Sequence, residues 1–118
     1  MRWLVAVAGS VAMVGLAGCH SAFVEATVVN RTDKVIPLIE VDYPSASFGT
    51  ENLAPGAQYH YRFKVLGEGE MKVIYTDFAQ KEHTVKGPEL REGAEGPLGI
   101  AIVAGGVEWS AQSLKSRK

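Results

Sequence analysis

The sequence predicts an all-β protein that folds as a single antiparallel β-sandwich. Apolar and polar residues alternate through most of the chain after Cys19, and helical periodicity is scarce there. Turn-forming residues separate the alternating stretches at short intervals, which is typical of sandwiches. About 100 residues follow the apolar N-terminal stretch, and that length suits one domain with its own core.

The first two predicted strands are joined by a polar turn. Residues 23–29 and 39–43 each alternate between apolar and polar side chains. The turn is expected at residues 30–33, because Asn and Asp favour turn conformations. Pro37 has no backbone donor, so the second strand should be an edge strand, contain a bulge or begin after Pro37.

The clearest alternation lies at residues 58–65. Pro55 and Gly56 precede this stretch and suit the central positions of a type II turn. The face expected to be buried comprises Tyr59, Tyr61, Phe63 and Val65. The tyrosines on such faces, including Tyr75 of the next strand, are expected in the core with their hydroxyl groups at its rim.

The rest of the domain is predicted to contain four more strands. Residues 71–76 alternate except at Ile74, and residues 98–102 alternate between large apolar and small side chains. Shorter candidates lie at residues 82–86 and 107–109. Gly105–Gly106 fits a two-residue hairpin loop, because glycine accepts positive φ angles. The segments expected as loops or as a frayed end are residues 44–50, 88–96 and 110–118.

The apolar N-terminal stretch has the organisation of a secretory signal peptide. Arg2 precedes an uncharged apolar run that ends in small residues, and this run is too short to span a bilayer. The junction Leu16-Ala17-Gly18-Cys19 resembles the lipobox of bacterial lipoproteins. The resemblance implies that the signal peptide is removed and that Cys19 carries a lipid anchor that includes palmitate. The chain would then be a lipid-anchored protein of the cell envelope.

The lipobox resemblance also divides the chain. Residues 1–18 are expected to be the signal peptide, residues 19–22 the lipidated N-terminus and tether, residues 23–110 the β-sandwich and residues 111–118 a polar, basic tail. In the best-studied envelope systems, an Asp after the lipidated cysteine retains the protein in the inner membrane. His20 stands at that position here, which favours the periplasmic side of the outer membrane.

Two short segments resemble parts of the immunoglobulin-like modules of bacterial envelopes. They are residues 28–32 (VVNRT) and residues 53–56 (LAPG). The resemblance implies an immunoglobulin-like sandwich. The cysteine pair and core tryptophan of antibody domains are missing.

The residue types needed for catalysis are scarce. Acylation would consume the only thiol, so a cysteine nucleophile is not expected. The histidines after the signal peptide are His20, His60 and His83, and no Gly-x-Ser-x-Gly motif accompanies them. The sequence therefore predicts a protein that is not an enzyme.

No metal, cofactor or nucleic acid is expected either. His60 and His83 could share a metal ion with Glu82 only if their strands pair, and Glu82 would even then point to the opposite face from His83. The formal net charge of −1 gives no electrostatic basis for binding nucleic acid.

Phe48 is the candidate contact residue, because it lies in a stretch of otherwise small and polar residues. It either plugs the open end of the sandwich or contacts a partner. The predicted function is a non-catalytic protein-binding or structural module that docks an envelope protein, for example by lending an edge strand. The alternative is a lipoprotein that binds a small ligand, with a cell-wall fragment, sugar or metal as candidates.

Overall fold

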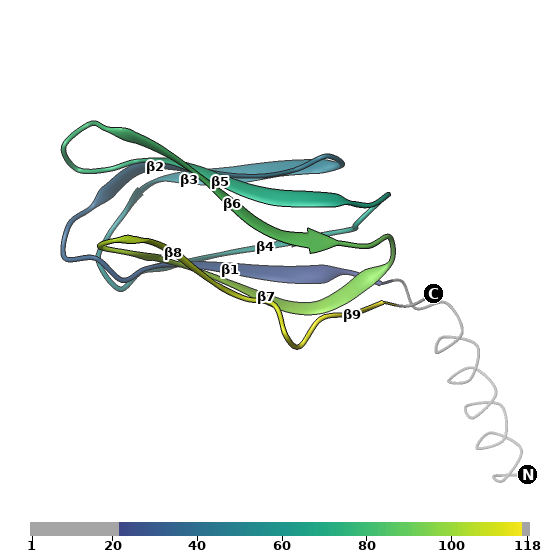
Figure 1. The fold of residues 1–118 in the computed structure, drawn as a ribbon. Helices are drawn as coiled ribbons and strands as arrows, with labels where there is room; N and C mark the ends of the chain where they lie inside the picture. Colours follow the sequence, from purple (N-terminus) through teal and green to yellow (C-terminus); the bar gives the residue numbers. More distant parts are fainter. Residues whose placement is uncertain (1–21, 117–118) are drawn as a thin grey trace, which may run out of the picture.

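The computed structural model describes residues 22–116, and these residues form two packed β-sheets without a helix (Figure 1). The nine strands are β1 (Val24–Asn30), β2 (Ile36–Tyr43), β3 (Ala46–Leu53), β4 (Gln58–Phe63), β5 (Gly69–Thr76), β6 (Glu82–Leu90), β7 (Ala94–Val103), β8 (Gly106–Ser110) and β9 (Lys115–Ser116). The predicted all-β sandwich is confirmed at this level.

Each sheet has a simple strand order. The first sheet runs β4-β1-β7-β8, with β9 also paired to β7, and the second runs β3-β2-β5-β6. Neighbouring strands are antiparallel except for β1 and β7, which are parallel. This pair departs from the predicted antiparallel arrangement. A parallel pair requires a long crossover, and here the crossover consists of β2 to β6.

The two ends of the sandwich differ. One end, which we call the base, carries residues 22 and 116; the other end, the tip, carries the β1–β2, β3–β4, β5–β6 and β7–β8 connections (Figure 1). Strand pairing agrees with this placement, because Val24 lies beside Gly96 and Ala94 beside Ser116.

The core lies between the sheets and follows the predicted alternation. Its fully buried side chains include Val24, Val28, Leu98, Ile100 and Ile102 from the first sheet and Ile39, Val41, Met71 and Val73 from the second. Tyr75 is also in the core, with 6% of its surface exposed. Burial of such apolar surface contributes about 25 cal/mol per Å² to folding, which makes this shared layer the main source of stability.

The prediction that Tyr61 lies in the core is wrong. Phe63 and Val65 are buried, but Tyr61 is 41% exposed and Tyr59 is half-buried. β4 is an edge strand of its sheet, so its inner face is covered from one side only. Alternation identified the face correctly but could not show that the strand lies at an edge.

The segment predicted as a loop at residues 44–50 is mostly strand. Residues 44–45 turn the chain between β2 and β3, and residues 46–50 pair with β2. Ser and Gly have low strand propensity, so the local sequence concealed β3. Pairing with the buried strand β2 supplies the stabilisation that local propensity lacks.

Three further boundaries differ from prediction. Residues 88–90 extend β6 and residues 94–96 begin β7, so the predicted loop at 88–96 shrinks to residues 91–93. Proline at position 88 is tolerated because β6 is an edge strand. Val103 pairs with Gly106, which places the hairpin loop at residues 104–105, one residue before the predicted Gly105–Gly106.

The predicted frayed end and the placement of Pro37 also need correction. β9 pairs with β7, so residues after 110 add to the sheet. β2 begins before Pro37 and is a central strand, but its pairing with β5 starts only at Leu38. The missing backbone N–H of Pro37 therefore removes no hydrogen bond to β5.

Candidate functional site

The predicted lipidation site, Cys19, lies outside the described residues, as do His20 and the predicted signal peptide, residues 1–18. Phe23, four positions after Cys19, lies at the base, with the Arg62 guanidinium carbon 4.1 Å from the centre of its ring. The base is therefore where the chain arrives from Cys19.

Phe48 lies in β3 and is 7% exposed. Its ring stacks on Tyr61 with 4.4 Å between ring centres, and it lies 5.5 Å from Phe63. These contacts join β3 of one sheet to β4 of the other. Phe48 thus plugs an open side of the sandwich and offers little surface to a partner.

His60 and His83 are not brought together. His60 is an exposed residue of β4 that shares a hydrogen bond of 3.0 Å between its Nδ1 and Thr27 Oγ1, whereas His83 belongs to β6 of the other sheet. Within residues 22–116, no group of three or more His, Cys, Asp or Glu side chains is placed to hold a metal ion.

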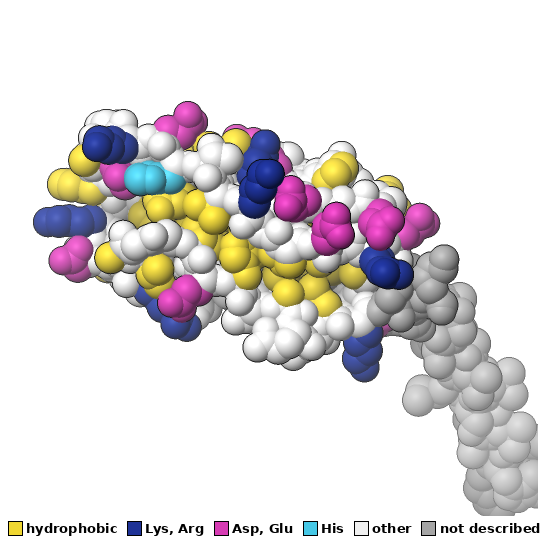
Figure 2. All heavy atoms as spheres, in the orientation of Figure 1, with side chains coloured by type: hydrophobic (Ala, Val, Ile, Leu, Met, Phe, Trp, Pro, Cys, Tyr) yellow, Lys and Arg dark blue, Asp and Glu magenta, His cyan; other side chains and the backbone are white. Residues whose placement is uncertain are grey.

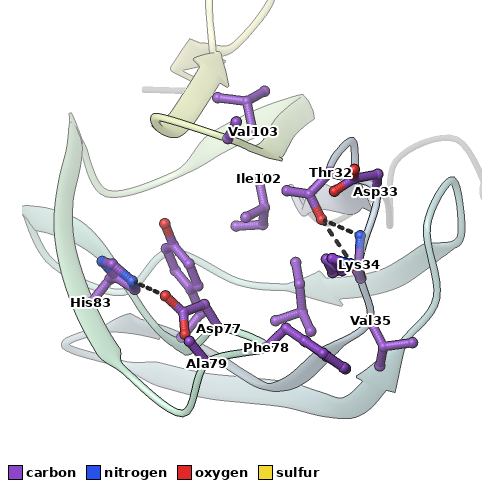
Figure 3. A pocket seen from close by; sticks show the side chains of 13 residues that line it. Thr32, Asp33, Lys34, Val35, Asp77, Phe78, Ala79, His83, Ile102 and Val103 are labelled. Atoms are coloured by element: carbon purple, nitrogen blue, oxygen red, sulfur yellow. Dashed lines mark hydrogen bonds and ion pairs between the residues drawn. The ribbon is translucent and has the colours of Figure 1, made fainter.

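A pocket of about 350 Å³ opens at the tip (Figure 3). It lies between the β1–β2, β5–β6 and β7–β8 connections, and we call it the tip pocket. It is lined by residues 32–36, 77–79 and 102–104 together with Tyr75 and His83. Ile36 and Ile102 are core residues, so the floor of the pocket is the end of the hydrophobic core.

Asn30 holds the first wall of the tip pocket. It is completely buried, and its Nδ2 donates to the carbonyl oxygens of Lys34 and Leu53, each at 2.8 Å. Its Oδ1 accepts from the Thr32 backbone N–H at 2.8 Å and from the Thr32 hydroxyl at 2.7 Å. One side chain thereby fixes the path of residues 31–35, as expected of an Asn-centred turn.

The β5–β6 connection forms the opposite wall. The Asp77 backbone N–H donates to the Lys81 carbonyl oxygen at 2.8 Å, and Asp77 Oδ1 accepts from the Lys81 N–H at 2.9 Å. These bonds close a tight loop that carries Phe78 at the pocket rim. Figure 3 shows Phe78 next to Val35 and below Lys34.

A histidine–carboxylate pair lies on this wall. Asp77 Oδ2 is 2.7 Å from His83 Nε2, and the His83 ring stacks on Tyr75 with 4.7 Å between ring centres. The hydrogen bond from His83, followed by the one from the Lys81 backbone, lowers the pKa of Asp77 below its ordinary value. Asp77 is therefore ionised at neutral pH, and it orients the His83 ring.

His83 lies in a polar stretch of the sequence, yet its side chain is half-buried in the pocket wall. A signal was present, since His83 has the same strand phase as Val85, and both face inward. Phe78 was missed altogether. It is an aromatic residue in a polar turn, the same pattern that drew attention to Phe48, and it is 60% exposed.

The tip pocket combines mainly apolar lining residues with a few polar ones. The Thr32 hydroxyl is engaged in the Asn30 turn, and no hydroxyl of the described residues hydrogen-bonds to His83. A nucleophile paired with a base, as acyl transfer requires, is therefore not formed by these residues. Apolar walls with a few polar groups are typical of ligand and side-chain recognition.

Comparisons with protein-family models, with characterised proteins and with solved structures find no match for this chain. Among residues 22–116 there is also no helix long and apolar enough to cross a membrane.

Proposed function

We propose that this protein is a lipid-anchored, non-catalytic module of the bacterial envelope that docks another envelope protein at its tip. The proposal includes acylation of Cys19, location on the periplasmic side of the outer membrane and an immunoglobulin-like type of sandwich. The last point is supported by residues 28–32 and 53–56, which are in contact: the Gly56 N–H donates to the Asn30 carbonyl oxygen at 2.7 Å.

One observation carries the docking proposal. The tip pocket and the exposed ring of Phe78 lie at the end of the sandwich opposite the base, where the chain arrives from Cys19 (Figure 1). A lipid at Cys19 would hold the base at the membrane and present Phe78 to the periplasm. Exposed aromatic residues next to apolar pockets are common contact points of protein partners.

The edge formed by β6 fits docking less well than the tip. β6 carries Glu82 and Lys86 on its outward face and contains Pro88, features that discourage the addition of another strand. The space between β6 and β8 is partly covered, because Trp109 lies across Gly87: a Cβ at position 87 would clash with the Trp109 ring. Figure 2 shows apolar atoms along this face, but charged side chains border them.

Binding of a free small molecule is the second candidate, and the size of the tip pocket favours it. About 350 Å³ is within the range of small-molecule sites. Asp77, His83 and Tyr75 line one wall and place polar groups beside an apolar floor, an arrangement common in small-molecule sites.

Site-specific photo-crosslinking in living cells distinguishes these functions. A photoreactive phenylalanine analogue is placed at position 78 and, as a matched control, at position 66. Leu66 is as exposed as Phe78, at 60%, but lies in the β4–β5 connection at the base. We expect one discrete protein adduct from position 78 and none of the same mass from position 66.

The adduct should appear in the membrane fraction. Its yield should fall in Lys34→Ala, because the Lys34 ammonium lies 5.5 Å from the centre of the Phe78 ring. Equal adducts from both positions, or no adduct from position 78, would reject docking at the tip.

A further inference from the structure

We propose that the group received by the tip pocket is apolar and ends in an uncharged oxygen acceptor, which hydrogen-bonds to the Tyr75 hydroxyl. The inference rests on the proposed function for its location and names the chemistry that this site selects.

The Tyr75 hydroxyl is an unused donor in a buried setting. Tyr75 is 6% exposed and lines the tip pocket, yet its hydroxyl has no hydrogen-bond partner among residues 22–116. Tyr43, the other deeply buried tyrosine, donates to the Gly67 carbonyl oxygen at 2.7 Å. Because Tyr75 lines the tip pocket, its hydroxyl is free to donate a hydrogen bond to a group that enters from outside.

The Tyr75 hydroxyl is also accessible. In the described part of the chain, Trp109 Nε1 is the one enclosed side-chain nitrogen or oxygen without a partner. The Tyr75 oxygen is therefore not sealed in the core and reaches the open space of the tip pocket. A ligand atom in the pocket can therefore accept a hydrogen bond from this hydroxyl.

The charges around Tyr75 select an uncharged acceptor. Burial, and then the negative charge of Asp77, raise the pKa of Tyr75, so the phenol stays protonated and remains a donor. The same charge of Asp77 opposes a carboxylate near the hydroxyl. An ammonium group has no lone pair to accept the phenolic proton.

The walls define the rest of the occupant. Val35, Ile36 and Ile102 offer apolar surface, and Phe78 lies at the rim. A ring or branched chain next to a carbonyl or hydroxyl oxygen satisfies both requirements. A side chain of a partner and a free small molecule can each supply this chemistry, so the experiment separates the two sources.

The test uses three probes with the same ring: phenylacetamide, phenylacetate and phenethylamine, which are uncharged, anionic and cationic. Each is titrated into the purified ¹⁵N-labelled protein and followed by NMR. Ligands of this size bind in the millimolar range. We expect phenylacetamide to bind most tightly and to shift the amide signals of residues 32–36, 77–79 and 102–104.

Tyr75→Phe keeps the ring and removes the donor. It should lower the affinity for phenylacetamide roughly two- to twelvefold, which corresponds to the loss of one hydrogen bond. The affinity for phenethylamine should stay within about twofold of the wild-type value. Tyr43→Phe is the control, because its hydroxyl lies near the base, and it should leave all three affinities unchanged.

Each of three results would overturn the inference: tighter binding of phenylacetate or phenethylamine than of phenylacetamide, an unaltered phenylacetamide affinity in Tyr75→Phe, or no signal shifts at the tip pocket.

The experiments also separate failure of this inference from failure of the docking function. If phenylacetamide suppresses the adduct formed at position 78, the oxygen acceptor belongs to the partner. If it binds as expected but no adduct forms, the pocket takes a free small molecule and docking is rejected. If the adduct forms but Tyr75→Phe leaves the phenylacetamide affinity unaltered, docking stands and the inference fails.

Discussion

Asn30 and Leu53 are joined across the tip by a hydrogen bond of 2.8 Å from Asn30 Nδ2 to the Leu53 carbonyl oxygen. The bond links the end of β1 to the end of β3, strands that belong to opposite sheets. Asn30 uses both amide hydrogens and its oxygen in this buried network, so each of its polar atoms is satisfied.

Asn30→Ala should therefore lower the free energy of unfolding by about 1–3 kcal/mol, because it leaves buried backbone groups without partners. Gln58→Ala, an exposed change at the start of β4, is the control and should cost under about 0.5 kcal/mol. Urea melts of both variants provide the measurement. A cost below that of the control would show that the Asn30 network contributes nothing.

Phe63→Ala and Lys64→Ala compare neighbouring positions on opposite faces of one chain segment. Phe63 is 4% exposed and contacts Phe48, so its truncation should cost about 3–5 kcal/mol. Lys64 is exposed, and its loss should cost under about 0.5 kcal/mol. Equal urea midpoints would contradict the placement of Phe63 in the core.

Tyr43→Phe and Tyr75→Phe remove the same atom from two buried tyrosines. The Tyr43 hydroxyl donates to the Gly67 carbonyl oxygen, so its removal should destabilise the protein by about 1 kcal/mol. The Tyr75 hydroxyl has no partner among the described residues, so its removal should be nearly neutral. Thermal melts without any added ligand test this. A larger loss in Tyr75→Phe than in Tyr43→Phe would show that the Tyr75 hydroxyl is already engaged.

The lowered pKa of Asp77 predicts a specific response to acid. Unfolding restores the ordinary pKa near 3.8, so the unfolded chain takes up the proton more readily. The stabilisation from ionised Asp77 is fully present above that value and is lost as the pH falls through the lower pKa of the folded state. The difference in unfolding free energy between the wild type and Asp77→Asn should therefore shrink below about pH 4.

Urea melts across pH measure this difference. Asp33→Asn is the control at the same pocket, because Asp33 is exposed and has no hydrogen-bonded side-chain partner in the described chain. A difference for Asp77→Asn that stays constant with pH would mean that the bond to His83 does not form in solution.

Cys19→Ser should abolish membrane attachment and leave the sandwich folded. Cys19 precedes β1 and is the only cysteine, so it has no disulfide to lose. Cell fractionation and circular dichroism supply the two measurements. A variant that stays in the membrane fraction, or that has lost its β-sheet spectrum once purified, would contradict the lipid-anchor proposal.

The sequence by itself determined the class of the fold and most of its core. Alternation with a period of two requires only that one face of a strand is buried, which is a local property of the chain. It therefore placed residues 39–43, 71–76 and 98–102 in strands, and Val41, Val73 and Ile100 within them are buried. Turn chemistry located the Pro55–Gly56 turn, where Gly56 has a φ of 78° and the Ala57 N–H bonds to the Ala54 carbonyl oxygen.

Tertiary structure alone decided which strands are edges and which side chains meet. β3 is stabilised by β2 rather than by its own propensity, and Tyr61 is exposed because β4 has a neighbour on one side only. The tip pocket joins residues near positions 33, 78 and 103, and its His83–Asp77 pair depends on how one loop closes. Periodicity within a strand carries no information about such neighbours, because they are set by the stacking of the two sheets.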